Sequence, residues 1–304
     1  MPPAPSTAPD PSPPSPTLLM DADCPPALLP GLARLLAHDG RLAVVRVAPG
    51  WHYAQWRHVR RLRAGGGRVF VAGAHAQRLA GTAGTPATAF DGFADVALHA
   101  ASLAPTAAAV RWPLGVHHDD PPPDRRALGL DAGHFVVHLP LGGSDGWRRR
   151  VTWGVALLRA AEADVRLLLT GPRPRVARLH RFTERLAEPG MVFHAEDESA
   201  GAAADLTVVP PGPWRRERLV AAAGLGAAVV LGSPNATHEN GLSIETWLNL
   251  PPVRIGTRLG YLRNERPGLQ AAGQAARAHA RRLVAQDDTP ERLLPDPPRR
   301  VGAA

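Results

Sequence analysis

The second half of the chain alternates between short apolar runs and longer stretches with helical spacing. Five apolar runs of strand length occur there, at 134–139, 165–170, 191–194, 205–209 and 227–231. The stretches between and after them predict helices, at 147–161, 174–187, 215–224 and 267–284. The runs are mostly apolar and do not alternate with polar residues, as expected of parallel strands buried on both faces. This order predicts a parallel sheet of βαβ units, which binds ligands beyond the carboxyl ends of its strands.

The first half alternates in the same way but offers fewer strands. Strands are predicted at 42–47, 68–72, 95–99 and 109–112, and helices at 26–37, 51–63 and 74–80. The stretch 81–93 is rich in Gly, Thr and Ala and predicts a loop. The first half is therefore expected to form a reduced α/β domain.

Proline-rich segments mark the ends and one boundary. We expect 1–25 and 287–304 to be disordered tails, because proline fixes φ and removes a hydrogen-bond donor. The loop PLGVHHDDPPP at 113–123 predicts a boundary between a domain over 26–112 and one over 113–286. Its neighbouring histidines and aspartates cannot easily converge on one ion, so no metal site is expected.

Composition narrows the function classes. Cys24 is the one cysteine, which excludes a disulfide framework within the chain. No run of about 18 apolar residues occurs, and we expect a cytoplasmic protein. The net charge is +8, and all 35 Lys and Arg residues are Arg. Because they are spread along the chain, we expect no nucleic-acid partner, although such charge favours anionic nucleotides and permits peripheral contact with membrane lipids.

A glycine-rich turn carries the clearest candidate chemistry. Gly142, Gly143 and Ser144 follow a predicted strand and precede a predicted helix, so their backbone N–H groups can cradle a phosphate. Arg149 and Arg150 can supply positive charge to a diphosphate. The alternative is a tight βα turn followed by a solvated helix face.

The order of these landmarks resembles the donor domain of family-4-type GT-B glycosyltransferases. Gly143 to Arg149 is similar to the family's Gly-x-x-x-x-x-Lys loop, with Arg in place of Lys, and LLLTGPRP (167–174), which contains Gly171, resembles LLLVGDGP. ADLTVVPP (204–211) resembles ADVFVLPS. The resemblance implies two Rossmann-like domains with parallel sheets, the N-terminal one truncated. It also implies a nucleotide-sugar donor that contacts Gly142, Gly143, Ser144, Arg149, Arg150 and Gly171, an acceptor that the sequence does not identify, and no cofactor.

The family's pair of glutamates, eight positions apart, is missing or displaced. An alignment that starts from Asp205 places Trp214 or Arg215, and Ala221, at those positions. A second alignment makes Glu239 and Glu245 the pair, six positions apart. We prefer the first alignment for the fold. For a working site we choose Glu239 and Glu245, because that segment offers no other acids.

His75 follows a predicted strand, and the resemblance implies a histidine near the reaction centre in that place. The alternative is an ordinary loop histidine. The sequence thus predicts a glycosyltransferase that transfers a sugar from a nucleotide-sugar. The alternative function is that of a catalytically inactive GT-B-like binding or scaffold protein, which the missing glutamates and the reduced first domain favour.

Overall fold

The computed structural model divides the chain into two compact units. The first comprises Met1–Cys24, Asp39–Asp91 and Ala97–Val110, and the second Pro25–His38, Gly92–Val96 and Arg111–Ala304. The structure describes residues 15–22, 24, 26–48, 53–64, 68–90, 107–110, 112–116, 124–140, 145–171, 179, 181–182, 190–212, 214–232, 242–247 and 249–294. The predicted strand 95–99 and most of the predicted helix 174–187 lie outside them.

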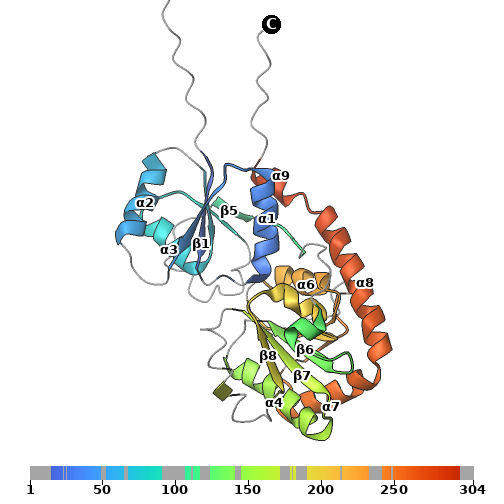
Figure 1. Ribbon diagram of the computed structural model, residues 1–304. Helices are drawn as coiled ribbons and strands as arrows, with labels where there is room; N and C mark the ends of the chain where they lie inside the picture. Colours follow the sequence, from blue (N-terminus) through green and yellow to red (C-terminus); the bar gives the residue numbers. More distant parts are fainter. Residues whose placement is uncertain are drawn as a thin grey trace, which may run out of the picture. The chain divides into compact units, whose positions relative to one another are not determined.

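The first unit contains a parallel sheet in the order β2-β1-β3-β4-β5 (Figure 1). Its strands are β1 (Thr17–Asp21), β2 (Ala43–Val47), β3 (Val69–Ala72), β4 (Thr88–Phe90) and β5 (Ala107–Val110). The helices α2 (Tyr53–Ala64) and α3 (Ala74–Thr82) pack on this unit, with Val59 and Leu79 in its core. This confirms an α/β unit.

Strands β1 and β4 correct the sequence-based prediction. Thr17–Asp21 was expected to belong to a disordered tail, yet all five of its residues are buried between β2 and β3. Thr88–Phe90 was expected to be loop, yet it pairs with β3 and β5. Strand β1 directly follows a proline-rich segment, and β4 has three residues within a stretch rich in Gly, Thr and Ala, so neither stands out in the sequence.

The second unit contains a parallel sheet in the order β11-β10-β9-β6-β7-β8. Its strands are β6 (Phe135–Pro140), β7 (Val165–Thr170), β8 (Val192–Ala195), β9 (Leu206–Val209), β10 (Ala228–Leu231) and β11 (Glu245–Thr246). Five of these strands confirm the apolar runs of the sequence, and β11 is an addition.

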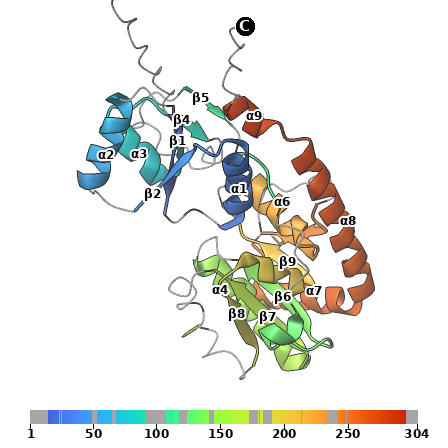
Figure 2. The same ribbon diagram turned by 45° about the horizontal axis from the view of Figure 1, so that its top comes forward.

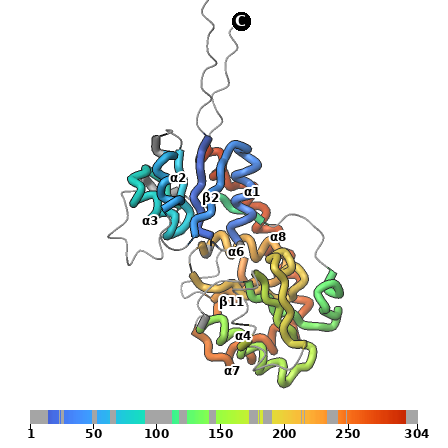
Figure 3. Tube along the Cα trace, turned by 60° about the vertical axis from the view of Figure 1, so that its left-hand side comes forward, coloured from blue at the N-terminus to red at the C-terminus, as the bar shows by residue number. Residues whose placement is uncertain are grey.

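Helices cover both faces of this second sheet (Figure 2). On one face α4 (Asp145–Ala161) and α7 (Pro252–Asn264) pack side by side over Val137, Val208 and Val230. On the other face α6 (Arg215–Gly224) packs over β9 and β10. The long helix α8 (Arg266–Ala285) lies beside α6 (Figure 3).

The ends of the second unit also differ from the prediction. Helix α1 (Leu29–His38), which was assigned to the first domain, belongs to the second unit. Its Arg34 donates to the carbonyl of Leu114 at 2.7 Å and pairs with Asp287 at 3.0 Å. Asp287 was expected to begin a disordered tail, yet helix α9 (Thr289–Leu293) follows it. A partly buried ion pair and its hydrogen bonds hold these two segments together, and such contacts leave no periodic pattern in the sequence.

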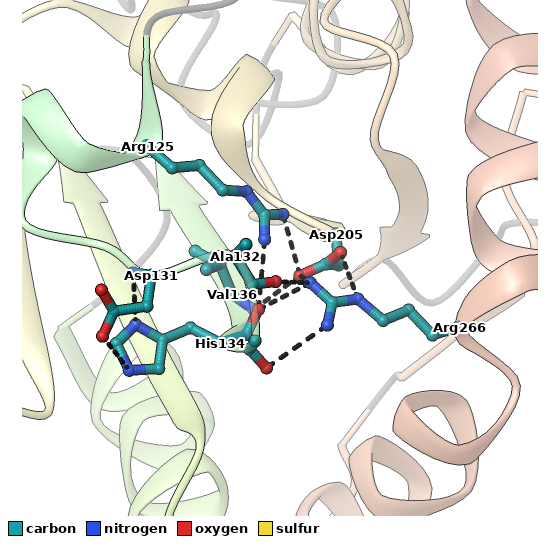
Figure 4. A network of polar contacts seen from close by, with 8 residues as sticks. Arg125, Asp131, Ala132, His134, Val136, Asp205 and Arg266 are labelled. Carbon is teal, nitrogen blue, oxygen red and sulfur yellow. Dashed lines mark hydrogen bonds and ion pairs between the residues drawn. The ribbon is translucent and has the colours of Figure 1, made fainter.

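A buried ionic cluster fixes the amino ends of β6 and β9 (Figure 4). The side chain of Asp205 is 1% exposed, and its Oδ2 accepts a hydrogen bond from the backbone N–H of Val136 at 2.9 Å. Arg266 donates from Nε to Oδ1 at 2.9 Å, and Arg125 pairs with Oδ2 at 3.1 Å. Arg266 also donates to the carbonyl of His134 at 2.7 Å. The cluster holds together the end of the sheet that faces away from the expected ligand side.

Candidate functional site

The second sheet changes direction between β6 and β9. These strands are neighbours, but the helix after β6 is α4 on one face and the helix after β9 is α6 on the other. Chain connections that leave adjacent strands toward opposite faces open a crevice at the carboxyl ends of those strands. The topology therefore places the candidate site at the ends of β6 and β9.

A line of buried polar side chains crosses the sheet near this point. His138 of β6 is 1% exposed, and its Nε2 lies 2.8 Å from Oγ1 of Thr170 on β7. Its Nδ1 lies 3.2 Å from Oγ1 of Thr207 on β9. A buried polar group is stable only with such partners. The two threonines therefore hold the imidazole in place from the two strands beside β6.

The 3-10 helix η4 (Glu198–Ala203) covers this polar line. Its start is fixed by Asp197, whose carboxylate accepts a hydrogen bond from the backbone N–H of Ser199 at 2.9 Å. Gly201 lies directly on the imidazole of His138, and a Cβ at this position would overlap the ring. A glycine is required here because the backbone itself touches the ring.

A small pocket opens between β6, β9, η4 and α6. The residues that line it include His138, Thr207, Glu198, Arg218 and Ala221. Two of them carry charge although both are buried, with 7% of Glu198 and 8% of Arg218 exposed. The pocket therefore combines an apolar helix face with a carboxyl group and a guanidinium cation.

Burial perturbs both charged groups. Burial raises the pKa of Glu198 to about 7, although the positive charge of Arg218 acts in the opposite direction. Burial lowers the pKa of the Arg218 guanidinium, against the attraction of Glu198 and Glu217. The carboxyl of Glu198 thus titrates close to neutral pH, as an acid or base that acts at neutral pH must.

The loop that leads into α6 has unusual backbone angles. Trp214 has a φ of 63° and Gly212 a φ of 133°, both in the left-handed region. Trp214 is 2% exposed and packs edge-on against Trp112, with ring centroids 5.7 Å apart. A left-handed conformation costs a non-glycine residue energy and is found often at functional sites. The buried ring contact holds the loop in this shape at the end of β9.

The predicted site residues meet different outcomes. Gly142, Gly143, Ser144 and Glu239 lie outside the described residues. Gly171 directly follows β7 with a φ of 128°, a value that favours glycine, and its carbonyl lies 2.8 Å from Nε2 of His194.

Arg149 and Arg150 lie on α4, and the first of them is exposed, with its guanidinium 5.4 Å from the ring centroid of Phe182. His75 belongs to the first unit, where its backbone N–H donates to Asp21 at 3.1 Å at the start of α3. Its side chain is half-buried.

Glu245 lies on the edge strand β11, where its carboxylate accepts a hydrogen bond from the indole N–H of Trp247. It is in register with Val230, which faces α4 and α7. Thr207 and Val209 face α6, so Glu245 lies on the opposite face of the sheet from the pocket. Helix α6 and strand β10 follow the order of the first alignment, and Ala221 is 2% exposed within α6.

Sequence reasoning missed Glu198 and Arg218. A signal for Arg218 exists, because it shares helical spacing with Ala221, Ala222 and Leu225, a stripe that is otherwise apolar. Glu198 gives no such signal, because its burial depends on a short 3-10 helix. Within the described part of the chain no cluster of three His, Cys, Asp or Glu side chains can hold a metal ion.

Comparison with known proteins supports the fold. No protein-family model matches the chain, and no curated protein matches its sequence. The structure is similar to HepE of Anabaena, solved with UDP and glucose, with 15% identity and a TM-score of 0.62 over 88% of this chain and 95% of that one. It is similar to sucrose-phosphate synthase of Thermosynechococcus elongatus, with 13% identity and a TM-score of 0.59 over 89% and 95%.

A third similar structure is MnaA of S. aureus, solved with UDP, with 8% identity and a TM-score of 0.58 over 88% and 95%. These likenesses confirm the expected fold class, an α/β chain with two Rossmann-like parallel sheets as in GT-B glycosyltransferases. The helices described in the structure include none that is long and apolar enough to cross a membrane.

Proposed function

We propose that the chain is a glycosyltransferase-like protein that binds a nucleotide-sugar through its second unit and transfers the sugar to an acceptor. The observation that carries this proposal is the crevice at the ends of β6 and β9, in a fold similar to HepE, which was solved with UDP and glucose. In sheets of this kind the ligand site is set by topology.

The first group of proposed contacts holds the diphosphate. Gly142, Gly143 and Ser144 precede α4 and offer backbone N–H groups, while Arg149 and Arg150 add positive charge. In glycosyl transfer the bond between the anomeric carbon and the diphosphate oxygen breaks as a bond to an acceptor oxygen forms. Negative charge grows on the leaving diphosphate, and fixed donors and cations stabilise it. No metal ion or cofactor enters this proposal.

The second group concerns the sugar, the nucleotide and the acceptor. Glu239 and Glu245 are the proposed contacts of the donor sugar, and Gly171 gives the nucleotide close access to the backbone after β7. The acceptor loses a proton as it attacks, and His75 is the proposed histidine near that reaction centre.

Titration calorimetry with nucleoside diphosphates and their sugars tests the proposal. We expect at least one of them to bind, and Arg149→Ala to weaken its binding about tenfold or more, because a hydrogen bond to a charged group is lost. Arg254→Ala on α7, which removes another exposed arginine, is the matched control and should bind normally. No binding at millimolar concentration to any of these ligands would refute the proposal.

A second candidate is a catalytically inactive protein that binds the nucleotide only. The buried Ala221 and Trp214, each 2% exposed, favour it because they stand where the resemblance implies glutamates. Incubation with a radiolabelled donor separates the two candidates. Binding without hydrolysis or transfer of the sugar supports the inactive protein.

A further inference from the structure

Arg218 is unusual for its place in the fold. It lies on α6 with Ala221 and Ala222, on the side of the helix that faces the sheet and the pocket, and the C-cap Leu225 continues that side. Arginine is almost never buried in this way unless it is paired. Only 8% of the residue is exposed, so most of its hydration is lost.

Two of the three guanidinium nitrogens lack partners in the described structure that would replace that hydration. Its Nε and Nη1 are buried and have no hydrogen-bond partner among the described residues. Glu198 and Glu217 supply nearby negative charge, but neither accepts a hydrogen bond from these two nitrogens. An unmet donor on a charged group is costly, and in a native protein it often marks a site for an ion or ligand.

The pocket beside Arg218 lies at the ligand end of the sheet. It reaches Pro140 at the end of β6 and Pro210 just after β9, the two strands that flank the crevice. The polar groups around it are the carboxyl of Glu198, the imidazole of His138 and the hydroxyl of Thr207. Both ring nitrogens of His138 already bond to Thr170 and Thr207, so Arg218 and Glu198 are the groups that face a ligand in this small space.

We infer that this pocket binds a phosphate group and that the guanidinium of Arg218 is its main contact. Arginine is always charged and offers donors in a planar arrangement that suits phosphate oxygens. None of the residues assigned to the donor sugar or to the glycine-rich turn takes part. The inference therefore stands apart from the proposed function, and the phosphate can belong to a nucleotide or be a free ion.

Glu198 makes the site sensitive to pH. The charged or titratable groups around it are Arg218 and Glu217 on α6, Asp197 beside it, and His138 on β6. Because burial raises the pKa of Glu198 to about 7, the carboxyl is neutral below that pH and can donate to a phosphate oxygen. Above it the carboxylate repels a bound anion.

Calorimetric titration of the full chain with inorganic phosphate tests the inference. We expect the wild-type chain to bind phosphate and Arg218→Met to lose at least about tenfold in affinity. Arg216→Met is the matched control, because Arg216 lies on the same helix and is exposed. Absence of phosphate binding in the wild-type chain, or equal affinity in the two variants, overturns the inference.

Two further measurements keep the test decisive. If Arg218→Met does not fold, Arg218→Lys retains the cation but loses the planar donors. It should bind phosphate several-fold more weakly than wild type, and unchanged affinity overturns the inference. Competition between UDP and phosphate then shows the source. Competition that depends on Arg218 indicates a nucleotide phosphate, and independent binding indicates a free ion, while failure of every nucleotide to bind refutes only the proposed function.

Discussion

Replacing Glu198 by glutamine should stabilise the protein at alkaline pH and not at acidic pH. Glu198 is 7% exposed, and burial raises the pKa of its carboxyl from an ordinary 4.5 to about 7. The folded state therefore binds the proton more tightly than the unfolded chain does. Stability from this group is fully present below pH 4.5 and is lost as the pH rises through about 7.

The magnitude follows from the same pKa difference. One pKa unit corresponds to about 1.4 kcal/mol, so the difference between 4.5 and about 7 corresponds to about 3 kcal/mol. The wild-type chain bears this cost at pH 8 because a carboxylate is then held in the pocket. Glu198→Gln keeps the shape of the side chain but cannot ionise. The free energy of unfolding of the variant, relative to wild type, should rise by about 3 kcal/mol between pH 4 and pH 8.

Urea unfolding followed by tryptophan fluorescence measures this difference. Five of the seven tryptophans, at 112, 147, 153, 214 and 247, belong to the unit that contains Glu198, so the signal reports that unit. Glu196→Gln is the control, because it removes an exposed carboxylate two residues away and should give a nearly constant difference. A stability difference for Glu198→Gln that stays flat from pH 4 to pH 8 would refute the assignment of a buried, costly carboxylate.

Two other changes test how the second unit is held together. Asp205→Asn should cost about 3 kcal/mol in urea unfolding, because Arg266 is left without its buried partner; Asp131→Asn, whose carboxylate is 83% exposed, is the control, and equal losses would contradict this reading. Gly273→Ala should cost about 1–3 kcal/mol, because its Cβ would overlap the backbone that enters β10. Gly268→Ala on the same helix meets nothing within 4 Å and should gain up to about 1 kcal/mol, so a loss there would count against the packing of α8.

The parallel sheet of the second unit could be predicted from the sequence, because each of its strands and helices has its own local pattern of apolar residues. The runs at 165–170 and 205–209 are mostly apolar and do not alternate, and helix 215–224 has the bounds that the structure shows. Strand β1 was missed because five buried residues directly after a Pro-rich segment do not make a period. Helix α1 was assigned to the wrong unit because its contacts, such as that between Arg34 and Asp287, join residues more than 250 positions apart.

The candidate site was harder to predict from the sequence, because it depends on which helices cover which face of the sheet. The sequence predicts that Glu245 is available to a ligand, but not that it is in register with Val230 and hydrogen-bonded by Trp247. Glu198 and Arg218 are 20 positions apart and meet only because η4 and α6 cover the same face of the sheet. The spacing of residues along the sequence cannot predict that Glu198 and Arg218 line the same pocket.

Helix α4 and helix α6 lie on opposite faces of the second sheet, and this relation limits how the candidate residues on them can act together. Arg149 is on α4, which packs on the face that Glu245 shares, whereas Arg218 lines the pocket from α6 on the other face. Glu245 also lies on β11, three strands from β6, which at about 4.8 Å per strand is roughly 14 Å. One phosphate group therefore cannot contact both Glu245 and a pocket lined by β6.

A nucleotide-sugar that used both groups would have to span the crevice between α4 and α6, with Arg149 and Arg218 on different parts of the ligand. The Arg149→Ala and Arg218→Met variants should then weaken UDP binding independently, with losses that add in free energy.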